Sequence, residues 1–216
     1  VGLGKTIEAG LMISQKWAER KRRILIITPA NLRKQWHQEM AEKFFLPCQI
    51  LETRSYKDAL KQGAQRPFEQ TDIIVICSYQ FARAKAEEIR RTRWDLVVID
   101  EAHRLRNVYK SSNIIANTLK GALQDAPKLL LTATPLQNSL LELFGLVSFI
   151  DERVFGDLQS FREQFASLND RRTFEILKTR LRPVCQRTLR RQVTSFVRYT
   201  RRHPILQPFT PEESED

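Results

Sequence analysis

Four short apolar runs, separated by longer amphipathic stretches, constrain the fold of this chain more than any other feature. The runs are rich in Ile, Val and Leu and are continuous rather than alternating: ILIIT (24–28), IIVICS (73–78), LVVID (96–100) and LLLTAT (129–134). Strands that are buried on both faces of a parallel sheet have this pattern. A weaker run at 48–53 is a candidate fifth strand.

The stretches between these runs predict helices at 7–19, 31–44, 79–91 and 111–122. Pro29 precedes Asn31, which we expect to cap the second of these helices. Strands that alternate with helices indicate an α/β fold with a doubly wound, mostly parallel sheet.

The pattern changes after about Asn138, where no further strand is evident. The segment SLLELFGLVSFID and residues 157–193 predict helices, interrupted at Pro183, and residues 199–216 have the proline-rich composition of a linker. We therefore expect a main lobe at 1–150, a helical extension at 151–198 and a linker at 199–216.

Composition limits the class of protein. A hydrophobic content of 42% in 216 residues supports a sizeable core, and no apolar run reaches the ~20 residues of a membrane span. Three cysteines without metal-ligand spacing, and no secretory signal, favour buried structural thiols in a reducing cytoplasm. The net charge is +11, and residues 176–211 hold nine Lys or Arg and no acid. This segment could contact a polyanion, or it could be a solvated or internally paired face.

Polar residues stand where each predicted strand ends, which is where ligands bind in open α/β sheets. Thr28 and Ser78 close the first two runs, Asp100 and Glu101 the third, and Thr132 and Thr134 the fourth. Helix capping would explain one or two of these residues. It explains four strand ends less well.

The opening VGLGKTIEAG resembles the second half of a phosphate-binding loop, whose first glycine would precede Val1. Gly2 and Gly4 would let backbone N–H groups approach phosphate oxygens. Lys5 would add positive charge at the β- and γ-phosphates, and Thr6 a hydroxyl for Mg²⁺. A helix that starts near Ile7 would point the positive end of its dipole at the same anion.

Asp100 follows an apolar strand directly, as a carboxylate that holds Mg²⁺ usually does, and Glu101 beside it could activate water. Capping of the next helix is the alternative interpretation. The GKT sequence upstream and the TAT sequence downstream make capping alone a poor explanation.

Taken together, GLGKTIEA (2–9), ITPANLRKQW (27–36), DEAH (100–103) and LTATPLQN (131–138) resemble the Swi/Snf-type branch of the superfamily-two helicase-like ATPases. LRPVCQRTLRRQV (181–193) resembles the segment that follows the first ATPase lobe, and the end of the chain is most like bacterial members, including those that associate with RNA polymerase. The resemblance covers essentially the whole chain and implies a RecA-like lobe at 1–150.

The resemblance also implies roles for individual residues. Gly2, Leu3, Gly4, Lys5 and Thr6 would hold ATP, Thr6 and Asp100 would bind Mg²⁺, and Glu101 would be the catalytic base. His103 and the Thr132, Ala133, Thr134 run would couple nucleotide state to DNA and to a second lobe. Thr28, Pro29, Arg33, Lys34 and Ser78 would track the DNA backbone. Trp36, by contrast, sits on an amphipathic helix, which favours a core position over base stacking.

The resemblance implies part of an ATP-driven translocase or remodeller of double-stranded DNA. It would work in the bacterial cytoplasm, at the nucleoid, with RNA polymerase or another DNA-bound complex as partner. A strand-separating helicase, a restriction-type translocase subunit and a non-catalytic nucleic-acid-binding module remain alternatives. The family's arginine fingers come from a second lobe, which does not follow residue 216. We therefore expect at most trace ATPase activity from this chain alone, and residues 1–6 to lack an anchor on one side.

Overall fold

The computed structural model describes residues 5–135, 139–165 and 170–186. The part up to Cys185 forms one compact unit. Its strands are β1 (Ile24–Thr28), β2 (Cys48–Ile50), β3 (Ile74–Ser78), β4 (Leu96–Asp100) and β5 (Lys128–Leu131). Its α-helices are α1 (Lys5–Ala18), α2 (Arg33–Phe44), α3 (Thr53–Lys61), α4 (Tyr79–Ala84), α5 (Ala86–Arg91), α6 (Ile114–Ala122), α7 (Leu140–Ile150), α8 (Leu158–Gln164) and α9 (Arg171–Leu181). Two 3₁₀ turns, η1 (Ala30–Leu32) and η2 (Ala102–Leu105), follow β1 and β4.

The described strands form one parallel sheet in the order β2-β3-β1-β4-β5. The three central strands are buried along their whole length, which explains why their sequences are continuous apolar runs. The predicted doubly wound parallel sheet is therefore confirmed. The predicted strand at 129–134 is shorter in the structure: β5 ends at Leu131, and the Thr134 N–H donates to Thr132 Oγ1 in a turn.

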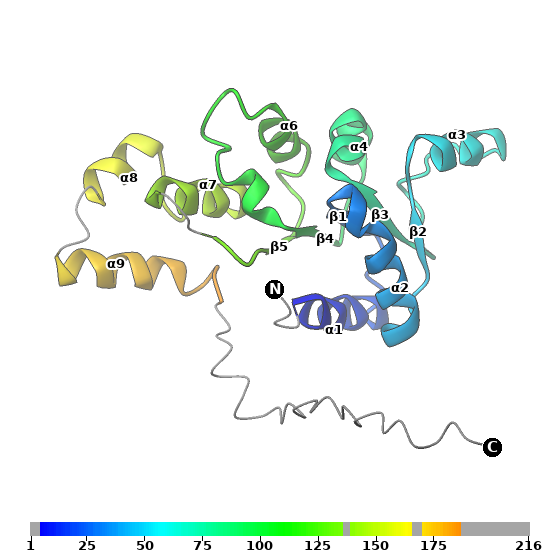
Figure 1. Cartoon of the computed structure of the whole chain (residues 1–216), viewed down its shortest axis with the longest axis horizontal. Helices are drawn as coiled ribbons and strands as arrows, with labels where there is room; N and C mark the ends of the chain where they lie inside the picture. Colours follow the sequence, from blue (N-terminus) through cyan, green and yellow to red (C-terminus); the bar gives the residue numbers. More distant parts are fainter. Residues whose placement is uncertain (1–4, 136–138, 166–169, 187–216) are drawn as a thin grey trace, which may run out of the picture. The chain divides into compact units, whose positions relative to one another are not determined.

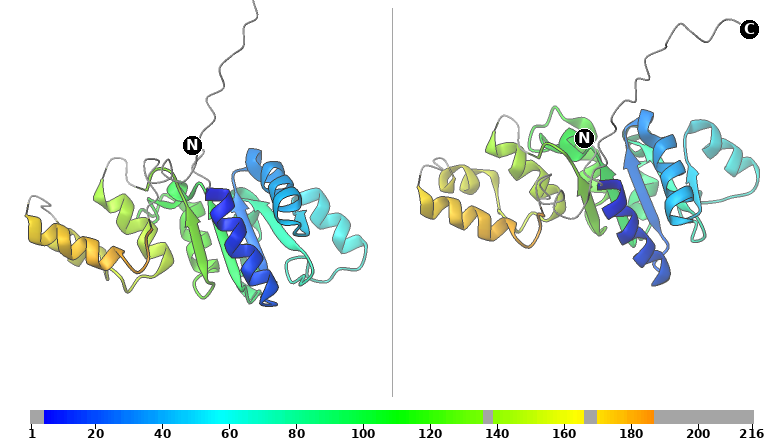
Figure 2. Two further views of the ribbon diagram at one scale, coloured as in Figure 1. Left: turned by 90° about the horizontal axis from the view of Figure 1, so that it is seen from below. Right: turned by 60° about the horizontal axis from the view of Figure 1, so that its bottom comes forward.

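Helices cover both faces of the sheet (Figures 1 and 2). Because successive side chains of a strand point to opposite faces, β1 sends Ile24 and Ile26 to one face and Leu25 and Ile27 to the other. The first pair packs with residues of α1 and α2, and the second pair with residues of α4, α5 and α6. Each face thus has its own hydrophobic core.

Short polar side chains begin most helices, although one predicted cap was wrong. Ser78, Asn113, Ser139, Asp157 and Asp170 each accept a backbone N–H at the start of a helix. Asn31 does not. It lies inside the 3₁₀ turn that Pro29 begins, and α2 starts two residues later without a side-chain cap. The predicted helix at 79–91 is divided at Lys85 into α4 and α5.

A third hydrophobic cluster joins α7, α8 and α9, and the division into a lobe at 1–150 and an extension at 151–198 stays a prediction. Helix α7 belongs to two clusters at once: Leu146 and Phe149 pack with the sheet, whereas Phe144 and Val147 pack with Phe161 and its neighbours. Helices α8 and α9 are therefore joined to the sheet through α7. The predicted linker at 199–216 and most of the arginine-rich segment after α9 lie outside the described residues.

The prediction of buried thiols was only partly correct. Cys77 is buried and Cys48 is half-buried, but Cys185 is exposed because it follows the end of α9 at the margin of the third cluster. Within the described part of the chain, no helix is long and apolar enough to cross a membrane.

Candidate active site

The carboxyl ends of four neighbouring strands lie at one edge of the sheet. Thr28 of β1 is paired in register with Ser78 of β3, and Asp100 of β4 with Leu131 of β5. The structure therefore brings the polar strand ends expected from the sequence to a common edge, which we call the carboxyl edge.

Asp100 is the most tightly held side chain at this edge. It is only 7% exposed, and its Oδ2 accepts hydrogen bonds from Trp36 Nε1 at 2.8 Å and from Thr28 Oγ1 at 3.3 Å. Its Oδ1 accepts the backbone N–H of Glu101 at 2.9 Å. These donors fix the orientation of the carboxylate. The prediction that Trp36 is a core residue is confirmed, since it is 2% exposed. Its contact with Asp100 was not foreseen, because 64 residues separate the pair in sequence.

The backbone at Asp100 and Glu101 is fixed as well. The Tyr79 hydroxyl donates to the Asp100 carbonyl oxygen at 2.7 Å, and burial raises the pKa of Tyr79, which keeps the phenol a donor. Glu101 adopts the left-handed conformation, with φ of 52°. Such a backbone is costly for a non-glycine residue and is concentrated at functional sites. Sequence reasoning missed Tyr79, whose apolar surroundings gave no sign of a polar partner.

Glu101 is half-buried, and its side chain lies beside His103. The His103 Nδ1 atom is buried and lies 3.1 Å from Glu101 Oε2, but the two groups are not aligned for a hydrogen bond. The contact is therefore electrostatic at most. The predicted base and the predicted coupling residue are thus neighbours.

Lys5 and Thr6 form the first turn of α1. This helix ends at Ala18, a few residues before β1 begins, so its carboxyl terminus lies at the amino edge of the sheet. Fourteen residues of helix span roughly 21 Å, about the length of the strands, and α1 contacts β4. The start of α1 therefore points toward the edge where Asp100 lies. Gly2, Leu3 and Gly4, the rest of the predicted phosphate loop, lie outside the described residues.

The chemistry of these side chains suits Mg²⁺, a hard cation that prefers oxygen ligands and keeps several waters. Asp100 has about four lone-pair positions, and three of them are taken by the donors described above. The Thr6 hydroxyl, in the first turn of α1, would be the second oxygen ligand that the sequence predicts. Within the described residues no group of three acidic, His or Cys side chains could hold a metal alone, so nucleotide phosphates and water would have to complete the shell.

A buried ion pair links the segment after β4 to α7. Arg106 Nε lies 3.4 Å from Glu142 Oε1, and Glu142 on α7 is only 4% exposed. The backbone of Arg106 also touches α7 at Gly145, where a Cβ atom would lie 1.9 Å from the Arg106 carbonyl oxygen. The segment after β4 is therefore packed closely against α7. Sequence reasoning did not single out this contact, because Glu142 lies in an otherwise apolar helix.

The residues predicted to contact DNA divide into two groups. Thr28, Pro29 and Ser78 are buried, and the two hydroxyls act inside the protein, on Asp100 and on the first turn of α4. Arg33 is paired with Glu52 at 2.8 Å, and Lys34 is exposed. DNA contact stays a prediction for all five, and Lys34 presents the most accessible charge.

The fold and the site define a RecA-like ATPase lobe: a parallel sheet whose carboxyl edge carries an ordered Asp-Glu pair, with a Lys-Thr pair opening a helix beside it. A family model described as the SNF2-related domain matches residues 1–206. The chain therefore belongs to the SNF2 family of superfamily-two ATPases.

Known relatives agree with this assignment. The chain is 38% identical over 169 residues to "Uncharacterized ATP-dependent helicase YqhH" of Bacillus subtilis, with 77% of this chain and 28% of the relative covered. It is 39% identical over 166 residues to "RNA polymerase-associated protein RapA" of Serratia proteamaculans, with 74% and 17% covered. The chain thus spans less than a third of these relatives.

Solved structures show the same fold. The Sulfolobus solfataricus SWI2/SNF2 ATPase core in complex with dsDNA matches with a TM-score of 0.70 at 22% identity, covering 87% of this chain and 38% of that one. The core domain from the same organism, without DNA in its description, matches with a TM-score of 0.64 at 24% identity, covering 85% and 36%.

Proposed function

We propose that this chain is the first ATPase lobe, residues 1–150, with a helical extension at 151–198, of an ATP-driven translocase on double-stranded DNA. The observation that carries the proposal is the ordered Asp100 at the end of β4, held by Trp36 and Thr28 next to Glu101. Membership of the SNF2 family and the DNA-bound state of a structural relative support it.

In this mechanism the chain's own residues bind and orient the reactants. Lys5 and the backbone N–H groups of residues 2–4 would bind the phosphates of ATP, and Thr6 and Asp100 would hold Mg²⁺, which would supply charge neutralisation at the phosphates. Glu101 accepts a proton from the water that attacks the γ-phosphate in line. Glu101 has a left-handed backbone and its carboxylate lies beside His103, whereas Asp100 is held by Trp36 and Thr28, so the two carboxylates have different surroundings.

The Glu101→Gln variant of the full-length protein tests this assignment. We expect it to bind ATP like wild type and to lose at least about 100-fold in DNA-stimulated hydrolysis, the usual contribution of a general base. Glu163→Gln, which alters an exposed carboxylate on α8, is the matched control and should keep full activity. Wild-type turnover by Glu101→Gln would show that the base is elsewhere. A wild-type protein without ATP hydrolysis would instead favour the non-catalytic binding module.

A strand-separating helicase is the second candidate, favoured by the name of the Bacillus relative. Displacement of a third strand from an intact duplex measures translocation, whereas release of one strand of a forked duplex measures unwinding. We expect the full-length protein to do the first and not the second. RNA polymerase, which the name of the Serratia relative suggests, or another DNA-bound complex is the proposed target, and the proposed site of action is the bacterial nucleoid.

A further inference from the structure

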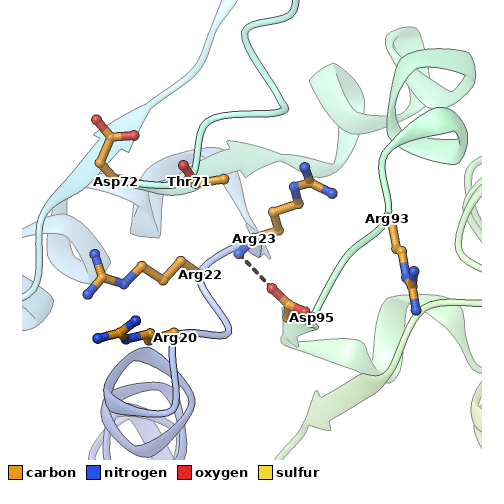
Figure 3. A pocket seen from close by; sticks show the side chains of 7 residues that line it. All are labelled: Arg20, Arg22, Arg23, Thr71, Asp72, Arg93 and Asp95. Atoms are coloured by element: carbon orange, nitrogen blue, oxygen red, sulfur yellow. Dashed lines mark hydrogen bonds between the residues drawn. The ribbon is translucent and has the colours of Figure 1, made fainter.

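A basic hollow lies at the opposite, amino edge of the sheet. It encloses about 660 Å³ and is lined only by charged and polar residues, namely Arg20, Arg22, Arg23, Thr71, Asp72, Arg93 and Asp95 (Figure 3). We call it the amino-edge hollow. None of its residues belongs to the candidate active site.

Sheet topology assembles this hollow from three loops. Arg20, Arg22 and Arg23 lie between α1 and β1, Thr71 and Asp72 precede β3, and Arg93 and Asp95 precede β4 (Figure 3). Because β3, β1 and β4 are neighbours in the sheet, their amino ends meet at one place. Two arginine-rich turns that are about 70 residues apart in the sequence therefore line one surface.

Hydrogen bonds hold the two arginine-rich turns together. The Arg23 backbone N–H donates to Asp95 Oδ2 at 3.0 Å, and the Asp95 backbone N–H donates to the Arg23 carbonyl oxygen at 2.9 Å. The Arg22 guanidinium lies 4.9 Å from the centre of the Trp17 ring, a cation–π contact. The Arg23 backbone and the Arg22 side chain are thus held in place, which lowers the entropy lost when a ligand binds.

The guanidinium groups of the four arginines form no ion pair with any side chain in the described part of the protein. Neighbouring basic residues are different: Lys21 pairs with Glu19 at 3.0 Å, and Arg90 with Glu87 at 2.7 Å. One of the two lining aspartates, Asp95, accepts the Arg23 backbone N–H. The hollow therefore keeps an excess of positive charge without an internal partner.

We infer that the amino-edge hollow binds the phosphodiester backbone of a nucleic acid, at a second contact separate from the ATP-dependent one. Guanidinium groups match phosphate oxygens in geometry and charge. An acidic peptide would also be attracted, but protein interfaces gain most from buried apolar and aromatic anchors, and no apolar residue lines this hollow. Strands of five residues separate the two edges by roughly 16 Å. The contact between DNA and the hollow is therefore a different one from any contact at the carboxyl edge.

The inference rests on the proposed function only in taking DNA as the partner. The test uses the full-length protein with Arg20→Gln, Arg22→Gln and Arg93→Gln combined, and measures duplex affinity from 50 to 200 mM salt. Loss of three phosphate contacts should reduce the slope of log affinity against log salt by about 2 to 3. The matched control removes three exposed arginines from α8 and α9, as Arg162→Gln, Arg171→Gln and Arg172→Gln. It should change the slope by less than about 1.

Further readouts separate the outcomes. The Arg→Lys version of the hollow variant keeps the charge and should keep the slope, and thermal unfolding should show all variants folded, since the altered side chains are exposed. ATP hydrolysis at saturating DNA should stay at the wild-type rate in the hollow variant. Loss of ATP hydrolysis in the Glu101→Gln variant, but not in the hollow variant, would test the proposed function separately. An unchanged slope, an equal change in the control, or loss of poly-glutamate binding without loss of DNA binding would overturn the inference.

Discussion

Trp36→Phe should weaken the candidate active site without removing any predicted catalytic group. The indole N–H is one of two side-chain donors to Asp100 Oδ2, and its 2.8 Å contact is shorter than the 3.3 Å contact of Thr28. Because the acceptor is a carboxylate that is only 7% exposed, water can replace the lost donor poorly. Hydrogen bonds to charged groups contribute about 1.5–3 kcal/mol, so we expect the free energy of unfolding to fall by about that amount.

The functional effect should appear in the Mg²⁺ dependence of hydrolysis. With one donor lost, Asp100 can rotate away from its metal-binding orientation. We expect a fall in kcat of about tenfold, the equivalent of 1.4 kcal/mol, and a higher Mg²⁺ concentration at half-maximal activity. The assay is steady-state ATP hydrolysis by the full-length protein with DNA, titrated with Mg²⁺, beside urea unfolding of the same samples.

Trp17→Phe is the matched control, because Trp17 is only partly buried and its indole N–H makes no hydrogen bond within the described residues. It should leave the Mg²⁺ titration unchanged. If Trp36→Phe loses stability but keeps wild-type kcat and Mg²⁺ dependence, the indole serves packing alone, and the reasoning that it positions Asp100 is refuted.

Two further predictions concern stability. Gly145→Ala should destabilise the protein by about 3 kcal/mol or more, because the added Cβ would lie 1.9 Å from a backbone oxygen that cannot move alone. The control is Gly121→Ala on α6, whose Cβ would meet open space. It should be neutral or stabilising by up to about 1 kcal/mol. Equal urea midpoints for the two variants would contradict this. Burial raises the pKa of the Cys77 thiol from 9.0 to about 12, so the folded chain keeps a proton that the unfolded chain releases. Stability should therefore be complete below pH 9 and fall as the pH rises toward 12, and Cys77→Ala should make that fall shallower in unfolding measured across this range. An unchanged pH slope would show that Cys77 does not contribute.

The sequence alone determined the central strands of the sheet, most of the helices and the polar residues at the strand ends. It did not show α3 (Thr53–Lys61). The runs at 24–28 and 96–100 became β1 and β4 with the same bounds, because a strand buried on both faces must be apolar at every position. The same pattern placed Asp100 at the carboxyl end of a strand, where the apolar run stops. Local signals were weaker where several backbone conformations compete. Asn31 looked like a helix cap, but the chain after Pro29 forms a 3₁₀ turn first.

Only the tertiary structure decided which side chains meet. Trp36 and Asp100 meet because α2 packs on the sheet at β2 and β3, and Trp36 belongs to the hydrophobic cluster that also includes Val98 of β4. No local pattern encodes that proximity. The amino-edge hollow likewise exists because β1 and β4 are neighbours, which brings Arg23 and Asp95 into mutual hydrogen bonds. Hydrophobic periodicity is a property of each segment, so it can be found in the sequence. Strand order and the polar contacts that depend on it are properties of the assembled sheet.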